Sequence, residues 1–211
     1  GSATALRVGA LDLDAGSSLN VALGQAAAST TVVKVAGDLQ LDGTLNISDA
    51  GGFGSGVYQL FSYGGNLTDN GLLFGLLPGT TLPGQLTLQT AIAQQINLVV
   101  QGTAGELQFW NGGKTNADGT IGGGSGTWGP GTNWTDVNGN LSETWDAQFG
   151  VFGGQAGTVT VAGKQSFTGL QFLTGGYQLV AGTGGSLAPV NAADGSLAAV
   201  RVNAGASTQI S

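Results

Sequence analysis

Hydrophobic and polar residues alternate along residues 37–67 in a pattern that predicts very short β-strands. Three strands are expected there, at residues 38–41, 44–48 and 57–63. A turn at Asp42 and Gly43 joins the first two strands, and a glycine-rich corner at 51–56 precedes the third. The apolar side chains expected to share one face are Leu39, Leu41, Leu45 and Ile47. Polar residues separate them, and this period of two indicates strands that are buried on one side.

The same pattern of short strands and glycine corners recurs along the chain. Further strands are expected at residues 6–13, 19–23, 30–35, 86–88, 96–100, 107–110, 158–161, 167–173, 177–180 and 199–202. A spacing of about 8–12 residues is typical of a sandwich, a barrel or a β-helix. Few hairpin turns separate clean strands, and the strands come in threes between glycine corners. The predicted fold class is therefore all-β, a three-sided parallel β-helix whose coils bury their apolar faces against one another.

One β-helical segment is expected over residues 1–211, with regular coils at 1–110 and further coils at 155–211. Residues 111–154 interrupt them with turn-forming residues, glycines and tryptophans, and are expected to form a loop-rich excursion pinned by aromatic side chains. The first two residues, Gly1 and Ser2, resemble the scar of a protease cleavage site, so the chain is expected to be an excerpt of a longer protein.

Composition supports a folded chain. Glycine accounts for 41 residues, far above the usual ~7%, yet there is no G-X-Y period and only 4 prolines. Apolar residues make up 41% of the chain and charged residues 8%, the reverse of a disordered composition. The net charge is −7 without any cluster of lysine or arginine, which disfavours binding to nucleic acid or to an anionic membrane.

The absence of histidine and cysteine removes the usual general base and the usual zinc ligands, and a Ser-His-Asp triad with them. We expect no catalysis, no metal site and no cofactor. Two acidic pairs were weighed against this expectation, Asp12 with Asp14 and Asp38 with Asp42. Carboxylates two residues apart on one strand lie about 7 Å apart, not far from the geometry of a retaining glycosidase. A solvated strand face explains the same pattern.

Three other motifs give weak signals. A Ser/Lys dyad stays open, but the lysines, Lys34, Lys114 and Lys164, lie in no recognisable motif. Residues 122–126, GGGSG, resemble a phosphate loop by composition alone. Asp118 and Asp194 each precede a glycine, as in calcium-binding nonapeptide repeats, but without tandem repetition, and Asx-turns account for them.

Aromatic residues form the most distinctive constellation. They are Trp110, Trp128, Trp134, Trp145 and Tyr177. Indole rings flanked by amides and carboxylates can stack on sugars while the polar groups bond the hydroxyls. The candidate ligand-binding residues are therefore Trp128, Trp134, Asn133, Asp136 and Trp110. The alternative is that the tryptophans anchor a glycine-rich loop that has little else to bury.

Several runs together resemble one known family. They are GDLQLDGTLNI, GFGSGVYQLFSYGGNLTDNGL, QINLVV, LQFWNGG, DGTIGGGSGTW with NWTD, VFGGQAGTVTV and GLQFLTGGYQL. In this order they resemble the passenger region of bacterial autotransporters (type V secretion), with its β-strand repeats. The resemblance covers about residues 32–187. It implies a right-handed parallel β-helix at the bacterial cell surface, and it implies no shared catalytic residues.

The resemblance also implies partners. A passenger serves adhesion, self-association or display, so host-cell or extracellular-matrix proteins and glycans are the expected partners. Contact with the membrane is expected only through a C-terminal outer-membrane barrel that is absent from this chain. Two alternatives remain: a carbohydrate-binding module that uses Trp128 and Trp134, and a polysaccharide-cleaving β-helix enzyme.

Overall fold

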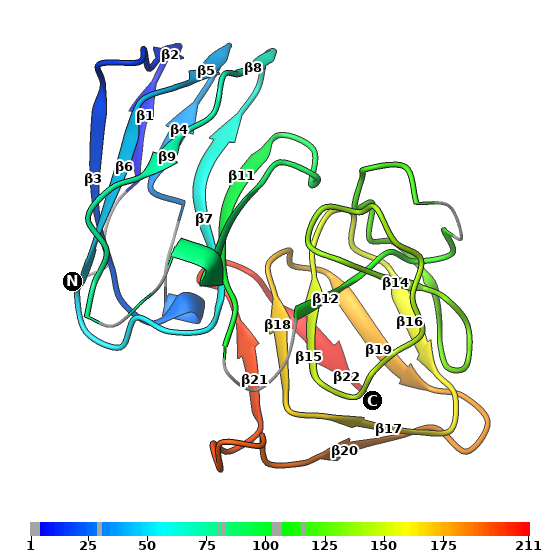
Figure 1. The fold of residues 1–211 in the computed structure, drawn as a ribbon. Coiled ribbons are helices and arrows are strands. Elements are labelled where there is room, and N and C mark those ends of the chain that lie inside the picture. The colour runs from blue at the N-terminus through cyan, green and yellow to red at the C-terminus, as the bar shows by residue number, and fades with distance from the viewer. Residues whose placement is uncertain (1–4, 29–30, 80, 82, 103–106, 115–116) are drawn as a thin grey trace. The chain divides into compact units, whose positions relative to one another are not determined.

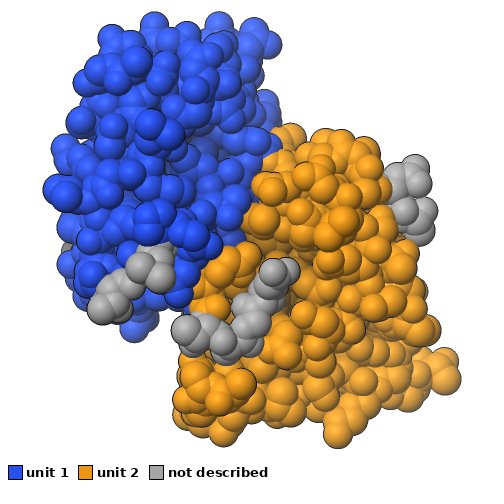
Figure 2. Space-filling view, viewed as in Figure 1, with its two compact units in different colours: residues 1–90, 94–100 blue, residues 91–93, 101–211 orange. Residues whose placement is uncertain are grey.

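The computed structural model describes residues 5–28, 31–79, 81, 83–102, 107–114 and 117–211 (Figure 1). The described residues form β-strands and two short 3-10 turns, η1 (Ala26–Ala28) and η2 (Pro83–Gln85), and they include no α-helix. The prediction of an all-β fold is confirmed. The chain divides into two compact units (Figure 2): residues 1–90 with 94–100, and residues 91–93 with 101–211. None of the described helical turns is long and apolar enough to cross a membrane.

The first nine strands of unit 1 pair in parallel in three sheets that the chain visits in turn. Its strands are β1 (Leu6–Val8), β2 (Leu11–Asp12), β3 (Ser18–Leu23), β4 (Val33–Val35), β5 (Leu39–Leu41), β6 (Thr44–Asp49), β7 (Gly56–Tyr63), β8 (Leu67–Asp69), β9 (Leu73–Phe74), β10 (Leu86–Gln89) and β11 (Gln95–Val100). The parallel sheets are β1-β4-β7, β2-β5-β8 and β3-β6-β9. Each strand therefore lies beside the strand that the chain forms one circuit later.

The alternation read from the sequence decides which side chains fill unit 1. Leu39 and Leu41 are each 1% exposed, and Leu45 is fully buried. Their polar neighbours face outward and bond polar side chains one circuit away: the Asn46 amide donates to the Asn20 side-chain oxygen at 2.9 Å, and the Gln40 amide donates to Asp12 at 2.6 Å. Apolar side chains from all three sheets therefore meet in one core.

Unit 1 is not parallel throughout. Strand β11 runs antiparallel to β7, and β10 runs antiparallel to β11, so two antiparallel strands extend the sheet of β1, β4 and β7. The chain reverses between them at Gln94, whose φ of 60° is left-handed. Strands expected near residues 86–88 and 96–100 are present, but they do not continue a parallel coil.

Unit 2 repeats the parallel arrangement with its own core. Its strands are β12 (Leu107–Trp110), β13 (Gly126–Trp128), β14 (Trp134–Thr135), β15 (Phe149–Phe152), β16 (Thr158–Val161), β17 (Lys164–Phe167), β18 (Gly169–Phe172), β19 (Tyr177–Ala181), β20 (Ser186–Pro189), β21 (Ala199–Val202) and β22 (Thr208–Ile210). The parallel sheets are β12-β15-β18-β21, β13-β16-β19-β22 and β17-β20. Strand β14 is antiparallel to β12.

The excursion begins and ends in one sheet, since β12 pairs directly with β15 although residues 111–148 separate them in the sequence. It contributes β13 and β14 on the way, so part of it is regular strand. The two units have separate hydrophobic clusters. Continuity of one coil from residue 1 to residue 211, with the boundaries given above, stays a prediction.

Gly123 occupies a corner of unit 2 where the chain closely approaches its neighbours. Its φ is +67°, and an added Cβ would meet the Gly153 carbonyl oxygen and the Tyr177 hydroxyl. That hydroxyl donates to the Gly153 carbonyl oxygen at 2.7 Å, and burial raises the pKa of the Tyr177 phenol well above its usual value. This corner therefore requires glycine for two reasons, its backbone conformation and its contacts.

We expect Gly123→Ala to lower the free energy of unfolding by about 2–4 kcal/mol, because alanine is strained in a left-handed conformation and its Cβ would displace neighbouring backbone. The matched control is Gly124→Ala, where φ is +88° but an added Cβ would meet nothing within 4 Å. Urea unfolding followed by circular dichroism measures both. Equal losses for the two variants would show that the close approach at Gly123 contributes nothing.

Candidate binding site

The tryptophans of the excursion lie in the core of unit 2. Trp110 and Trp128 are fully buried and Trp134 is 1% exposed. The Trp134 ring contacts Trp110 edge-on at 5.4 Å and Trp128 edge-on at 5.2 Å between ring centroids. The ring centroid of Trp134 also lies 4.3 Å from that of Trp145 and 5.4 Å from that of Phe152. These rings hold the glycine-rich excursion against β15 and β18.

The indole nitrogens separate the tryptophans into two kinds. Trp110 Nε1 donates to the Gly124 carbonyl oxygen at 2.8 Å, and Trp145 Nε1 donates to the Ser166 carbonyl oxygen at 2.7 Å. Trp128 Nε1 and Trp134 Nε1 are buried and find no hydrogen-bond acceptor among the described residues. Both rings make edge-to-face contacts, in which a ring edge points at the π-face of a neighbour. Ring packing therefore holds these two indoles in place without a hydrogen bond from their nitrogens to any described residue.

The other two candidate ligand-binding residues, Asn133 and Asp136, form hydrogen bonds with backbone groups. The Asn133 amide donates to the Gly112 carbonyl oxygen. Asp136 Oδ1 accepts from the backbone N–H groups of Asn140 at 2.6 Å and Leu141 at 2.9 Å, so its carboxylate organises the turn after β14. Of the five candidates, Trp110, Trp128 and Trp134 come together in the core, and Asn133 and Asp136 lie in the adjoining loops. Sugar stacking on these indoles stays a prediction, and it would require the cluster to open.

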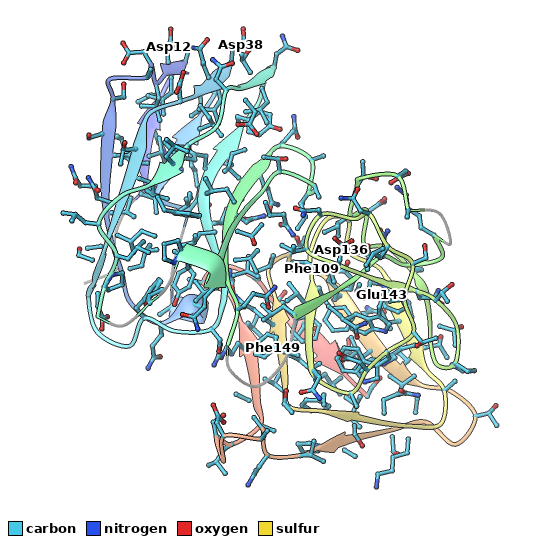
Figure 3. All side chains as sticks on the ribbon, viewed as in Figure 1. Asp12, Asp38, Phe109, Asp136, Glu143 and Phe149 are labelled. Atoms are coloured by element: carbon cyan, nitrogen blue, oxygen red, sulfur yellow. The ribbon has the colours of Figure 1, made fainter. Side chains whose placement is uncertain are left out.

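A hollow of about 750 Å³ lies on unit 2 beside this turn. Its lining residues come from the residue after β11, the start of β12 and the loops on both sides of β14. They are Gln101, Leu107, Gln108, Thr132, Asp136, Val137, Leu141, Ser142, Glu143, Thr144 and Asp146. Figure 3 labels two of them, Asp136 and Glu143, in the loop-rich part of unit 2. Asp136 is the one lining residue that the sequence pattern had singled out.

Gln108 fixes one wall of the hollow. Its side chain is 5% exposed, and its amide nitrogen donates to Glu143 Oε2 and to the Thr144 carbonyl oxygen, each at 3.0 Å. Its amide oxygen accepts from the Asp146 N–H at 3.0 Å. The backbones of Glu143 and Trp134 are also paired: the Glu143 N–H donates to the Trp134 carbonyl oxygen at 2.8 Å, and the Trp134 N–H donates to the Glu143 carbonyl oxygen at 3.2 Å. The Glu143 carboxylate is therefore held by a buried amide, and the backbone that carries it is held by a strand edge.

The other acidic candidates serve turns and ladders. Asp12 accepts from the Gln40 amide at 2.6 Å, Asp14 from the Gly16 N–H and Asp38 from the Asn66 N–H. Hydrogen bonds from Thr120 and Lys114 hold the pKa of the exposed Asp118 carboxyl below its usual value. No group of three acidic side chains among the described residues is placed to hold a metal ion.

Comparison with curated proteins finds one relevant similarity. The relative is named "Adhesin BmaC autotransporter" and comes from Brucella suis biovar 1 (strain 1330). The two sequences are 39% identical over 186 residues, which are 80% of this chain and 5% of the relative. This similarity supports an autotransporter passenger region for the chain. No family model and no solved structure matches the chain.

The autotransporter assignment confirms the resemblance read from the sequence runs, and it places the segment at the bacterial cell surface. The relative is named an adhesin, which describes attachment and not catalysis. The chain spans only 5% of that relative's length, so the activity and partners of the whole protein are proposals for this segment. Sequence reasoning missed Gln108, Glu143 and Asp146 because their meeting depends on strand pairing between distant positions, which no local motif announces.

Proposed function

We propose that this passenger segment is a structural stalk that also adheres, without chemistry of its own. The observation that carries the proposal is the 39% identity to a protein named an adhesin over 80% of this chain. The acidic pairs predicted as alternative catalytic groups serve as turn and ladder acceptors instead, as Asp12 and Asp14 do. Adhesion through side chains on the outside of a repetitive scaffold fits this arrangement.

The stalk is a right-handed, three-sided parallel β-helix interrupted by antiparallel strands. Strands that return to their own sheet after each circuit support it: Leu11 pairs with Leu39 and Leu39 with Leu67, one circuit being 28 residues at this point. Crossover connections between parallel strands of one sheet are right-handed in about 98% of cases, which supports the handedness. Such coils stack on their neighbours, so stability accumulates along the axis.

The mechanism is presentation. A stack of short strands held by in-register ladders is stiff. Residues 111–148, most of the excursion, are the longest stretch between two paired strands of unit 2. The partners that follow are host-cell or extracellular-matrix proteins or glycans, with self-association as a further outcome. Binding would be spread over an extended surface, because such a stalk offers many shallow contacts.

The proposal is tested by attachment. We expect beads coated with the segment to bind cultured host cells and immobilised matrix proteins saturably, and the soluble segment to compete. Beads coated with an unrelated acidic protein of similar net charge are the control. Attachment that does not saturate, or that the soluble segment does not reduce, would contradict an adhesive role and leave the segment as stem. Bead-to-bead clumping that the soluble segment blocks would assign the adhesion to self-association.

A further inference from the structure

The hollow beside β14 has the size of a ligand site. Its volume of about 750 Å³ lies within the range of about 300–1,000 Å³ that is usual for ligand pockets. One wall is fixed by the buried Gln108, which bonds both Glu143 and the Thr144 backbone. The lining also includes the turn that Asp136 closes. Side chains that are held in place before a ligand arrives lose little freedom on binding, which favours affinity.

The charge of the hollow selects the ligand. Among the described residues, its ionisable lining side chains are Asp136, Glu143 and Asp146, and none of them is a lysine or an arginine. Carboxylates around a concavity focus a negative potential in it, so anionic ligands are repelled and cations are attracted. Glu143 is half-buried, and one of its oxygens is bonded to Gln108 while the other accepts no hydrogen bond from the described residues. That oxygen is available to a cation.

A bare metal ion is not the cation that this hollow suits. Metal sites need several oxygens converging on one point, and the described residues contain no such group of acidic side chains. Asp136 Oδ1 already accepts hydrogen bonds from two backbone N–H groups of its own turn. The negative charge is therefore spread over the lining, which suits a ligand whose positive charges are spread as well.

The uncharged lining residues point to a cation with an apolar stem. Leu107, Val137 and Leu141 line the same hollow, and Leu141 is 51% exposed. Lysine and arginine lay their methylene stems along such surfaces while their charged ends reach carboxylates. The described lining residues include no aromatic side chain on which a sugar could stack.

We propose that this hollow binds a basic segment of a partner protein, with lysine or arginine side chains directed at Glu143 and Asp146 and their stems packed on the aliphatic lining. The proposal rests on the adhesive function proposed above and names the class of partner for unit 2. Asp136 is a positioning residue in it, because its carboxylate shapes the turn that carries Leu141.

The test is fluorescence anisotropy of a labelled tetra-arginine peptide titrated with the intact segment at low salt. The matched ligand is tetra-citrulline, which has the same shape as tetra-arginine without its charge. We expect saturable binding of tetra-arginine only. The double variant Glu143→Gln/Asp146→Asn should weaken it about tenfold, the sum of two partly exposed ion pairs. Both replacements keep an oxygen that can accept the hydrogen bonds from Gln108 and Gln148.

The control variant is Asp12→Asn/Asp14→Asn in unit 1, which changes the net charge by the same amount and keeps oxygens for Gln40 and Gly16. Equal weakening by the two double variants would overturn the proposal in favour of attraction by net charge. Equal binding of tetra-citrulline, or saturable binding of chitotriose in place of tetra-arginine, would overturn it as well. Circular dichroism confirms that each variant is folded.

Failure here is distinguishable from failure of the adhesive function. Suppose that the segment attaches saturably to cells, that Glu143→Gln/Asp146→Asn leaves this attachment unchanged, and that tetra-arginine does not bind. The proposed basic-peptide site would then be wrong, and the adhesive function would stand. Suppose instead that Glu143→Gln/Asp146→Asn abolishes tetra-arginine binding, and that coated beads do not attach to cells. The basic-peptide site would then stand, and the adhesive function would be wrong.

Discussion

Leu45→Asp is expected to unfold unit 1. Leu45 on β6 has no exposed surface and lies in the core between the three sheets. Removing a buried leucine costs about 2–5 kcal/mol, and leaving a carboxylate unpaired in an apolar core costs several more. The sum rivals the whole stability of a domain, about 5–15 kcal/mol. Hydrogen exchange followed by mass spectrometry should show lost protection in β5 and β6.

The control for Leu45→Asp is Asn20→Asp on the neighbouring strand β3. It adds the same carboxylate to an outward position, and the new side chain can still accept from the Asn46 amide. We expect protection in unit 1 to be unchanged. Strands β16 and β19 of unit 2 belong to a separate hydrophobic cluster and serve as the internal reference. Retained protection around Leu45→Asp would contradict the inward direction of that residue.

The sequence predicts most of unit 1 because a short strand has only two faces. Once Leu39, Leu41 and Ile47 share a face, their burial follows, and each is 3% exposed or less. The turn at Asp42 and Gly43 was equally readable: Asp42 Oδ1 accepts from the Gly43 N–H, and Gly43 has a φ of +83°. Local chemistry decides these features, so no knowledge of distant residues is needed.

Strand direction was not readable in the same way. A run such as 96–100 has the composition of a buried strand whether its neighbour runs parallel or antiparallel, and β11 proves antiparallel to β7. Strand β14 is only two residues long and lies in a stretch rich in turn formers, so no periodicity marks it. Its pairing with β12 brings Gln108 near Glu143 and Asp146. The hollow thus depends on contacts between residues more than 30 positions apart, which an isolated sequence does not display.

Trp134→Ala is expected to lower the free energy of unfolding of unit 2 by about 3–5 kcal/mol, the usual range for removing a buried tryptophan. Trp134 contacts Trp110, Trp128, Trp145 and Phe152, so its removal leaves a cavity at the centre of the aromatic cluster. Urea unfolding followed by circular dichroism measures the loss without relying on tryptophan emission. A loss below about 1 kcal/mol would mean that the cluster does not anchor the excursion.

Two phenylalanine variants separate packing from hydrogen bonding in the same cluster. Trp134→Phe and Trp110→Phe each shorten a buried ring, but only Trp110 donates a hydrogen bond, to the Gly124 carbonyl oxygen. We expect Trp110→Phe to be about 1 kcal/mol more destabilising than Trp134→Phe, the net worth of one such bond. Equal losses would mean that ring packing alone holds both side chains. In either case the cluster acts by filling the core, because the rings of Trp110 and Trp134 are too buried for a ligand to reach them unless the cluster opens.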